Sequence, residues 1–219
     1  VADILDAGPL VMSNERSANY GNLEWHGRQV NHQWSKSLEF EDLLRRTLET
    51  DGLEPDRYFS LLRSFRELDI ARMFAQFPQY FVNFTSCNQV YKIDPANRSR
   101  SWCGVCPKCH FVFLILAPYM SQDALVDIFG FNLLDVPENV EAYEEILGLQ
   151  GNKPFECVGE YDEAAEALLA LSTRPEWSSN AVVSALAAKA AGVPTTDDSA
   201  DDRVPAAYIA ARDGIAAHD

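Results

Sequence analysis

Three of the five cysteines of this 219-residue chain lie within seven residues, and a fourth precedes them by sixteen residues. The pattern is Cys87-x15-Cys103-x2-Cys106-x2-Cys109. Two-residue spacers let successive sulfurs converge on one ion, and Gly104 gives the backbone freedom to turn there. A closed set of four thiolates is typical of structural zinc sites. The sequence therefore predicts a zinc-binding segment over residues 87–109.

Other interpretations of the cysteines remain open at this point. An iron–sulfur cluster uses similar spacings, and buried thiols of no special role are also compatible with the pattern. His110 can replace one thiolate, although a histidine beside a ligand usually points elsewhere. A disulfide framework is disfavoured, because it would spread and pair the cysteines instead of crowding three of an odd number. The crowding favours a metal and a reducing compartment.

Charge and hydropathy exclude several classes of protein. The formal charge of −15 at pH 7 argues against general nucleic-acid binding, because an acidic surface repels phosphate backbones. The most apolar run, residues 111–117, is far shorter than the roughly 20 residues that span a bilayer. Residues 1–10 lack the basic start and long apolar core of a signal peptide. We therefore expect a cytoplasmic protein that has no membrane segment.

The spacing of apolar residues predicts an α/β fold. Residues 9–12 are apolar and precede a polar run, as when a buried parallel strand delivers polar side chains at its carboxyl end. Apolar spacing and alanine-rich composition predict helices at residues 37–49, 58–65, 67–77, 110–119, 121–129, 140–148, 163–171, 180–191 and 204–217. Composition changes near residue 160, which predicts a domain over residues 1–160. Residues 161–219 are then an Ala/Asp-rich helical tail that is partly flexible around residues 195–202.

Polar side chains are dense between residues 13 and 37. The candidate functional residues of this segment are Ser13, Asn14, Glu15, Arg16, Arg28, Asn31, His32 and Lys36. The carboxylate can bind a metal or take a proton, and the basic side chains can face phosphates or carboxylates. An ordinary surface loop seldom places so many hydrogen-bonding types between apolar elements. Ser37 also fits a helix cap, which is a purely structural interpretation.

Four blocks of the sequence resemble the MurL family of UDP-N-acetylmuramoyl-L-alanyl-L-glutamate epimerases. They are residues 11–18 (VMSNERSA), 30–37 (VNHQWSKS), 102–113 (WCGVCPKCHFVF) and 152–160 (NKPFECVGE). The resemblance covers roughly residues 1–160. More distantly, the cysteine segment is similar to the zinc segment of QueC-type enzymes, which belong to the ATP pyrophosphatase (PP-loop) superfamily.

The resemblance implies a fold and a larger polypeptide. The fold would be the C-terminal part of a PP-loop (adenine nucleotide alpha hydrolase-like) parallel-sheet domain, with a zinc-binding loop and a mostly helical C-terminal region. The chain contains no SGGxDS loop, and MurL proteins are considerably longer. The loop that binds the ATP phosphates is therefore expected upstream of Val1, in a missing N-terminal part of the same polypeptide. The chain alone is expected to be inactive.

The resemblance also implies a reaction. MurL-type enzymes use ATP and Mg²⁺ to invert the α-carbon of the terminal L-glutamate of UDP-MurNAc-L-Ala-L-Glu. Adenylation of the carboxylate removes its charge and allows the enolate to form beside it. Asn14 and Glu15 would lie near ATP or magnesium, and the remaining binding residues would be Ser13, Arg16, Asn31, His32 and Lys36. The expected catalytic residues are Glu15, His32 and Cys157.

Cys157 is included because thiols carry the proton in cofactor-free glutamate racemases, and its alternative role is that of a small buried core residue. Two other functions also remain open. One is a QueC-like ligase or amidating enzyme that acts on another carboxylate. The other is a zinc-ribbon interaction module without catalysis, which leaves the polar segment at residues 13–37 unexplained.

Overall fold

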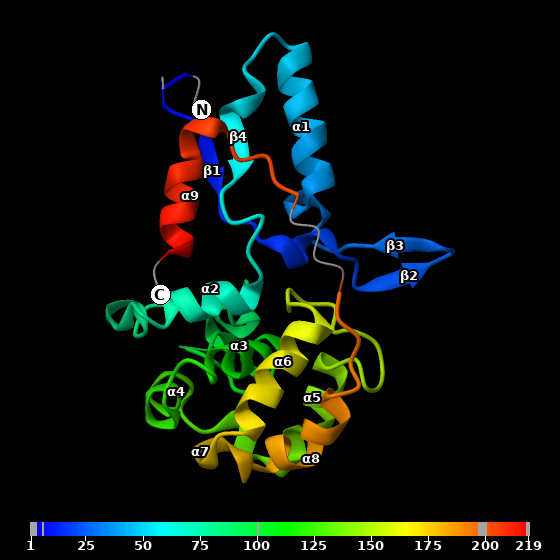
Figure 1. Ribbon diagram of the computed structural model, residues 1–219, viewed down its shortest axis with the longest axis vertical. Helices are drawn as coiled ribbons and strands as arrows, with labels where there is room; N and C mark the ends of the chain where they lie inside the picture. The colour runs from blue at the N-terminus through cyan, green and yellow to red at the C-terminus, as the bar shows by residue number, and fades with distance from the viewer. Residues whose placement is uncertain (1–3, 6, 100, 197–200, 218–219) are drawn as a thin grey trace. The chain divides into compact units, whose positions relative to one another are not determined.

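The computed structural model describes residues 4–5, 7–99, 101–196 and 201–217. The chain forms two compact units, both visible in Figure 1. Unit 1 comprises Val1–Glu67 and Asp197–Asp219, and unit 2 comprises Leu68–Thr196. These limits differ from the boundary near residue 160, which stays a prediction about domains. Part of the segment predicted to be flexible, residues 197–200, lies outside the described residues.

Unit 1 contains a parallel pair of short strands. β1 (Leu10–Met12) pairs with β4 (Tyr58–Ser60), with Val11 opposite Phe59. Phe59 is fully buried, whereas the apolar side chains of β1 are 37–54% exposed. Parallel strands are normally covered on both faces. The described part of unit 1 therefore leaves apolar surface of β1 open to solvent.

The segment at residues 58–65 is not a helix, so this prediction was wrong. Its first three residues form β4, and a turn follows. Pairing with β1 uses the backbone of this strand, and the buried carboxylate of Glu41 accepts a hydrogen bond from Ser60 N at 3.1 Å. Short apolar runs fit a helix or a strand equally well, and here pairing with β1 selects the strand.

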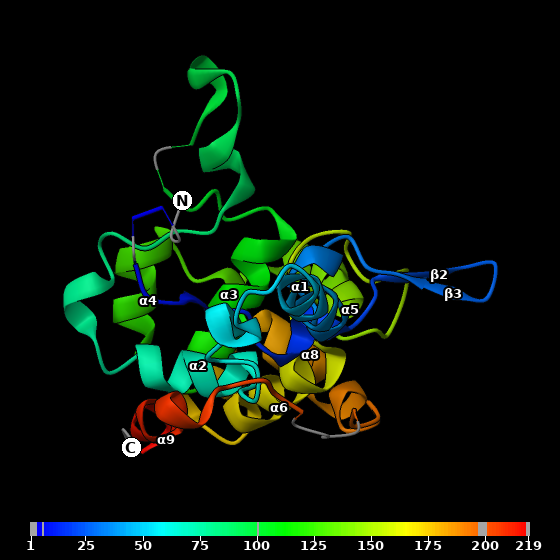
Figure 2. The same cartoon turned by 90° about the horizontal axis from the view of Figure 1, so that it is seen from above.

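An antiparallel hairpin and two helices complete unit 1. β2 (Leu23–Trp25) pairs with β3 (Arg28–Val30) across His26 and Gly27, which both have positive φ, as a tight two-residue turn requires. Figures 1 and 2 show this hairpin projecting beyond α1 (Leu38–Thr50). The side chain of Ser37 caps α1 by accepting from Phe40 N, which confirms its structural role. α9 (Ile209–Ala216) follows Tyr208, whose ring packs against Phe59.

Unit 2 is helical and is built around α3 (Pro107–Leu116). Seven of the ten residues of α3 are buried, because the helix is apolar around its whole circumference and is covered on several sides. Among the described residues, α3 packs against α4 (Gln122–Phe129), α5 (Val140–Ile146) and α6 (Tyr161–Ser172). The other helices of the unit are α2 (Glu67–Phe74), which begins at its boundary, α7 (Pro175–Ser178) and α8 (Ala181–Ala190).

The predicted α/β class is confirmed at this coarse level. The described residues form one parallel and one antiparallel pair of strands together with the helices. The alanine-rich helices α6 and α8 pack against each other and bury Leu168 and Leu186. No helix in the described part of the chain has the length and apolar character needed to cross a membrane.

Candidate metal centre and polar loop site

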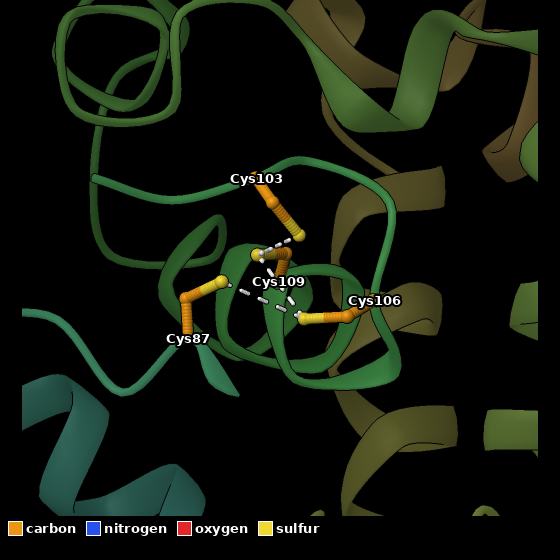
Figure 3. A group of neighbouring side chains, drawn as sticks. All are labelled: Cys87, Cys103, Cys106 and Cys109. Carbon is orange, nitrogen blue, oxygen red and sulfur yellow. Dashed lines mark hydrogen bonds between the residues drawn. The ribbon is translucent and has the colours of Figure 1, made fainter. Parts of the chain in front are cut away.

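The four predicted metal ligands come together in unit 2 (Figure 3). Their sulfur atoms all lie within 4.8 Å of one another, and three of the four residues are buried. The Sγ–Sγ distances are 3.9 Å for Cys87–Cys106, 3.7 Å for Cys103–Cys109 and 3.5 Å for Cys106–Cys109. Figure 3 shows the four sulfurs pointing toward a common centre. This arrangement can hold a metal ion.

Local chain geometry places each thiol. Cys106 occupies the N-cap of α3 and Pro107 follows at the first helical position, so that Cys106 and Cys109 lie on the first turn. The amide groups at a helix start stabilise negative charge there, which suits thiolate ligands. The segment between Cys87 and Cys103 carries two 3₁₀ turns, η5 (Asn88–Tyr91) and η6 (Pro95–Asn97), and projects away from the helices of unit 2 in Figure 2.

Gly104 is required by the shape of the cysteine loop. Its φ of +72° is a left-handed conformation, and a Cβ there would lie 2.7 Å from the ring of Phe131. The carbonyl of Gly104 lies 3.2 Å from Nε2 of His110. The His110 imidazole therefore contacts the loop backbone. The side chains that can hold a metal ion together are those of the four cysteines.

The thiols and the neighbouring side chains shift one another's pKa values. Hydrogen bonding with the Cys109 side chain lowers the pKa of Cys106 to about 4, and the same interaction raises the pKa of Cys109. Burial lowers the pKa of His110, so its neutral form is favoured. Burial also raises the pKa of Tyr143, whose ring lies 5.1 Å from that of His110.

The polar segment predicted at residues 13–37 is organised around Arg63 of unit 1. The Arg63 guanidinium is fully buried and donates to Glu15 O (3.0 Å), Asn19 Oδ1 (3.4 Å), Lys36 O (2.7 Å), Glu41 Oε2 (3.1 Å) and Ser60 Oγ (3.2 Å). Its ion pair with Glu41 is shielded from water on both sides, since the two side chains are 0% and 1% exposed. The two ends of the polar segment therefore meet at a single side chain.

The sequence did not point to Arg63 or Glu41. The signal for Arg63 was a charged residue inside the apolar run Leu61–Phe65, where charge is costly unless paired, and nothing in the sequence distinguishes Glu41 from the other charged residues of α1. That signal does not name the partner, because the two residues are 22 positions apart.

The predicted residues of the first strand end take distinct positions. Ser13 is exposed, and Asn14 Nδ2 donates to Ser60 Oγ at 3.1 Å. Glu15 caps η1 (Arg16–Asn19), with its carboxylate accepting from the backbone N–H and hydroxyl of Ser17. Arg16 is buried, and its backbone N–H donates to Phe65 O. Burial raises the pKa of Glu15, and the hydrogen bonds from Ser17 oppose this shift.

The predicted residues of the second loop lie in the same unit. Asn31 Nδ2 donates to Ala18 O at 2.8 Å, and its Oδ1 accepts from Gln33 N at 2.9 Å. His32 Nδ1 is hydrogen-bonded to Asn22 Oδ1. Lys36 is exposed and ends η2 (Trp34–Lys36). Asn31 thus links η1 to the loop that precedes η2, and its role in ligand binding stays a prediction.

Cys157 lies in unit 2 within a segment held by a buried ion pair. Lys153 Nζ is 2.5 Å from Glu160 Oε1, and the two side chains are 6% and 15% exposed. Burial raises the pKa of Glu160, and the charge of Lys153 opposes this shift. Gly159 packs so closely on α3 that a Cβ would lie 2.4 Å from the ring of Phe111. The half-buried Cys157 therefore lies on a constrained loop, and sequence reasoning missed the ion pair that closes it.

The fold and the thiol cluster define a class: a mixed α/β protein with four cysteines that can hold a metal ion at the start of a buried helix. Comparison with known families makes this more specific. The family model of the MurL N-terminal domain matches residues 1–61, and the family model of the MurL C-terminal domain matches residues 83–201. The chain belongs to the MurL family, which confirms the resemblance of the four sequence blocks.

Similar curated proteins agree with this assignment. The chain is 50% identical to a Micromonospora protein over 179 residues, 51% identical to a Salinispora tropica protein over 179 residues, and 47% identical to a Xanthomonas oryzae pv. oryzae protein over 174 residues. Each is named UDP-N-acetyl-alpha-D-muramoyl-L-alanyl-L-glutamate epimerase. The matches cover 80–82% of this chain but only 39–40% of those relatives. No solved structure matches the chain.

Proposed function

We propose that this chain is part of an enzyme that epimerises the terminal L-glutamate of UDP-MurNAc-L-Ala-L-Glu to D-glutamate, in peptidoglycan precursor synthesis. The observation that carries the proposal is the identity of about half of the aligned residues to relatives with that name, over about four fifths of the chain. Such an enzyme is an isomerase, and its nucleotide-linked substrate belongs in the cytoplasm.

The reaction needs activation of a carboxylate. A proton on the α-carbon is barely acidic beside a carboxylate, because the carbanion would lie next to an existing negative charge. ATP with Mg²⁺ would supply the adenylate that removes this charge and would release pyrophosphate. A base then takes the α-proton, an acid returns a proton to the opposite face, and hydrolysis releases AMP and the D-glutamyl product.

The residues of this chain have proposed roles in these steps. Asn14 and Glu15 lie two and three residues beyond β1, near the strand end where α/β proteins place ligands, which supports a position near ATP or magnesium. The residues proposed to bind phosphates or substrate carboxylates are Ser13, Arg16, Asn31, His32 and Lys36. Glu15 and His32 are candidates for proton transfer. The raised pKa of Glu15 makes its protonated form more accessible than that of an ordinary carboxyl group. Cys157 is the third, because its loop is held firmly by Lys153 and Glu160.

We infer that a further part of the polypeptide completes the nucleotide site. The chain spans about 40% of the length of its curated relatives, and it contains no SGGxDS loop. The exposed apolar side chains of β1 would be covered by crossover helices if this strand belonged to a larger parallel sheet of the PP-loop type. An upstream segment would then carry the phosphate-binding loop.

We propose that the metal of the cysteine centre is zinc and that its role is structural. A tetrahedron of sulfurs with Zn–S distances of about 2.3 Å has edges of about 3.8 Å. The observed separations of 3.5, 3.7 and 3.9 Å lie close to this value. Sulfurs that all lie within 4.8 Å of one another leave room for one ion and not for a multi-iron cluster. Four protein thiolates also close the site to water and substrate, as in structural zinc centres.

The full-length protein provides the test. Incubation with ATP, Mg²⁺ and UDP-MurNAc-L-Ala-L-Glu in deuterated water should yield AMP, D-glutamate after acid hydrolysis, and deuterium at the α-carbon. A reaction without ATP is the control. AMP without D-glutamate would contradict the proposal and favour a ligase of the QueC type. Absence of both, together with absence of nucleotide binding, would favour an interaction module.

The role of Cys157 is tested separately. Cys157→Ala in the full-length protein should abolish epimerisation and deuterium incorporation while the zinc content stays unchanged. Unchanged incorporation would remove this thiol from the mechanism.

A further inference from the structure

A cavity of about 880 Å³ lies within unit 1, between the β2–β3 hairpin and the start of α1. The side chains that matter for its chemistry are those of Trp25, Arg28, Asn31, Trp34, Glu39 and Asp201. Ligand sites commonly have volumes of about 300–1,000 Å³ and combine aromatic walls with a few polar groups. The roles proposed above include Asn31, but they give no function to the two tryptophans.

Two indole rings at this cavity are exposed. Trp25 is 65% exposed and Trp34 is 42% exposed, whereas the other two tryptophans of the chain, Trp102 and Trp177, are buried. Exposing so much aromatic surface is unfavourable unless a ligand or partner covers it. Trp34 is held in place, because its Nε1 donates to Glu39 Oε2 at 2.7 Å and its ring packs edge-on against Phe40. Its ring is therefore fixed before any ligand arrives.

The hairpin places an arginine next to one of these rings. Arg28 and Trp25 are opposite each other across the two-residue turn, so their side chains lie on the same face of the hairpin. Arg28 is exposed, and no hydrogen bond or ion pair of its side chain is found among the described residues. A guanidinium beside an exposed indole matches a pyrophosphate attached to a flat ring.

The two acidic side chains at the cavity keep their charge, but each has a local partner. Glu39 accepts from Trp34, and Asp201 pairs with Arg203 at 3.3 Å. Arg28 is thus the charged side chain of the cavity wall for which the described residues provide no hydrogen-bond or ion-pair partner. An exposed guanidinium without a partner favours an anionic group of the ligand next to Arg28.

We propose that this cavity binds the sugar-nucleotide part of the substrate, with Arg28 on the pyrophosphate and Trp25 and Trp34 against the uracil and sugar rings. The inference rests on the proposed function, because that function supplies a UDP-sugar. It assigns recognition of the UDP-sugar to the hairpin and to Trp34. The residues that act on the glutamate end of the substrate are different ones.

Binding of UDP-MurNAc to the full-length protein tests the proposal, because this ligand lacks the dipeptide and no turnover is needed. Calorimetric titration should show that Arg28→Gln and Trp25→Ala each weaken UDP-MurNAc binding about tenfold or more, with ATP affinity unchanged. Arg28→Lys should retain part of the affinity, since it keeps the charge but loses the bidentate geometry. In turnover, the same variants should raise KM for UDP-MurNAc-L-Ala-L-Glu and leave kcat unchanged.

Two control variants separate ligand contacts from hairpin folding. Leu23→Ala removes an apolar side chain from the same hairpin outside the cavity, and Arg46→Gln removes an exposed arginine from α1. Both should bind UDP-MurNAc like the wild type. Equal weakening by the controls, wild-type binding by the Arg28 and Trp25 variants, or weakened binding of ATP alone would each overturn the proposal. A wild type that binds UDP-MurNAc but forms no D-glutamate would instead refute the proposed reaction.

Discussion

The two units bury different kinds of side chain. Among the described residues, unit 1 buries the apolar side chains of Ala18 and Phe59, together with eight polar or charged ones that include Arg63 and Glu41. Unit 2 has the reverse balance: its buried apolar residues surround α3, and its buried polar residues are His110, Lys153, Glu163 and Asn180. Unit 2 therefore has a hydrophobic core of its own, whereas unit 1 is held by a polar network.

This difference suggests a division of labour. A polar interior with exposed apolar strands is costly for an independent domain, but it suits a region that binds charged ligands and is covered by further protein. A packed helical core with a thiol cluster suits a stable support. The predictions below test whether the two units depend on these different interactions.

The largest effect is expected from loss of the metal centre. Cys106→Ser should remove the zinc and unfold the region around η5, η6 and the start of α3, because metal binding contributes directly to folding, at a cost of about 5 kcal/mol or more. Zinc content by mass spectrometry and hydrogen exchange of residues 84–116 measure this. Exchange in β1 and α1 should change little.

Cys157→Ser is the matched control, because it replaces the remaining cysteine in the same unit. It should retain the zinc and the protection of α3. A Cys106→Ser protein that is free of zinc and still protected at α3 would contradict the structural role of the metal.

The next effect concerns the polar network of unit 1. Arg63→Met should destabilise unit 1 by about 3–5 kcal/mol, because it leaves the carboxylate of Glu41 buried without its charged partner. Hydrogen exchange of β4 and α1 reports the loss. The double variant Arg63→Met/Glu41→Leu should recover part of it, since neither buried charge remains. If the double variant lost more unfolding free energy than the two single variants lose together, the ion pair would not be the main interaction.

A smaller effect separates backbone strain from crowding at the metal loop. Gly104→Ala and Gly130→Ala both place a side chain at positive φ, with φ values of 72° and 89°. The added Cβ meets the Phe131 ring only at Gly104, since nothing lies within 4 Å of it at Gly130. Gly104→Ala should therefore cost about 1–3 kcal/mol more in stability than Gly130→Ala. Equal losses in chemical denaturation would show that the ring moves aside freely.

The smallest effect is a pH dependence in unit 1. Burial raises the pKa of Glu15, so the folded protein holds this proton more tightly than the unfolded chain. Stability from this group is fully present below the unfolded pKa and is lost as pH rises through the folded pKa. Glu15→Gln should thus gain stability relative to the wild type between acidic and neutral pH. Urea denaturation across that range measures the difference, and a constant difference would exclude the buried carboxyl as its cause.

The cysteine site was predictable because most of its geometry is local. The two-residue spacers bring Cys103, Cys106 and Cys109 within reach of one ion wherever the loop lies. The beginning of α3 is local as well, since Pro107 follows an N-cap position. The cap of α1 at Ser37 was predictable for the same reason.

The hairpin and β4 were not predictable in the same way. Residues 58–65 have apolar spacing that fits a helix, and only the pairing with β1 selects a strand. The hairpin turn uses His26 at positive φ, a residue that rarely signals such a turn. In both cases the deciding partner lies elsewhere in the chain.

The sequence by itself determined the family, the four thiols and the helices around α3, because these depend on short spacings and on apolar periodicity. The tertiary structure alone decided that Arg63 would gather the ends of the polar segment, that Lys153 and Glu160 would close the loop of Cys157, and that two exposed tryptophans would flank a cavity with Arg28. Each of these features joins side chains through burial and long-range pairing. The free energy of each interaction depends on which side chains are buried together, and a local sequence pattern does not specify which distant side chains these are.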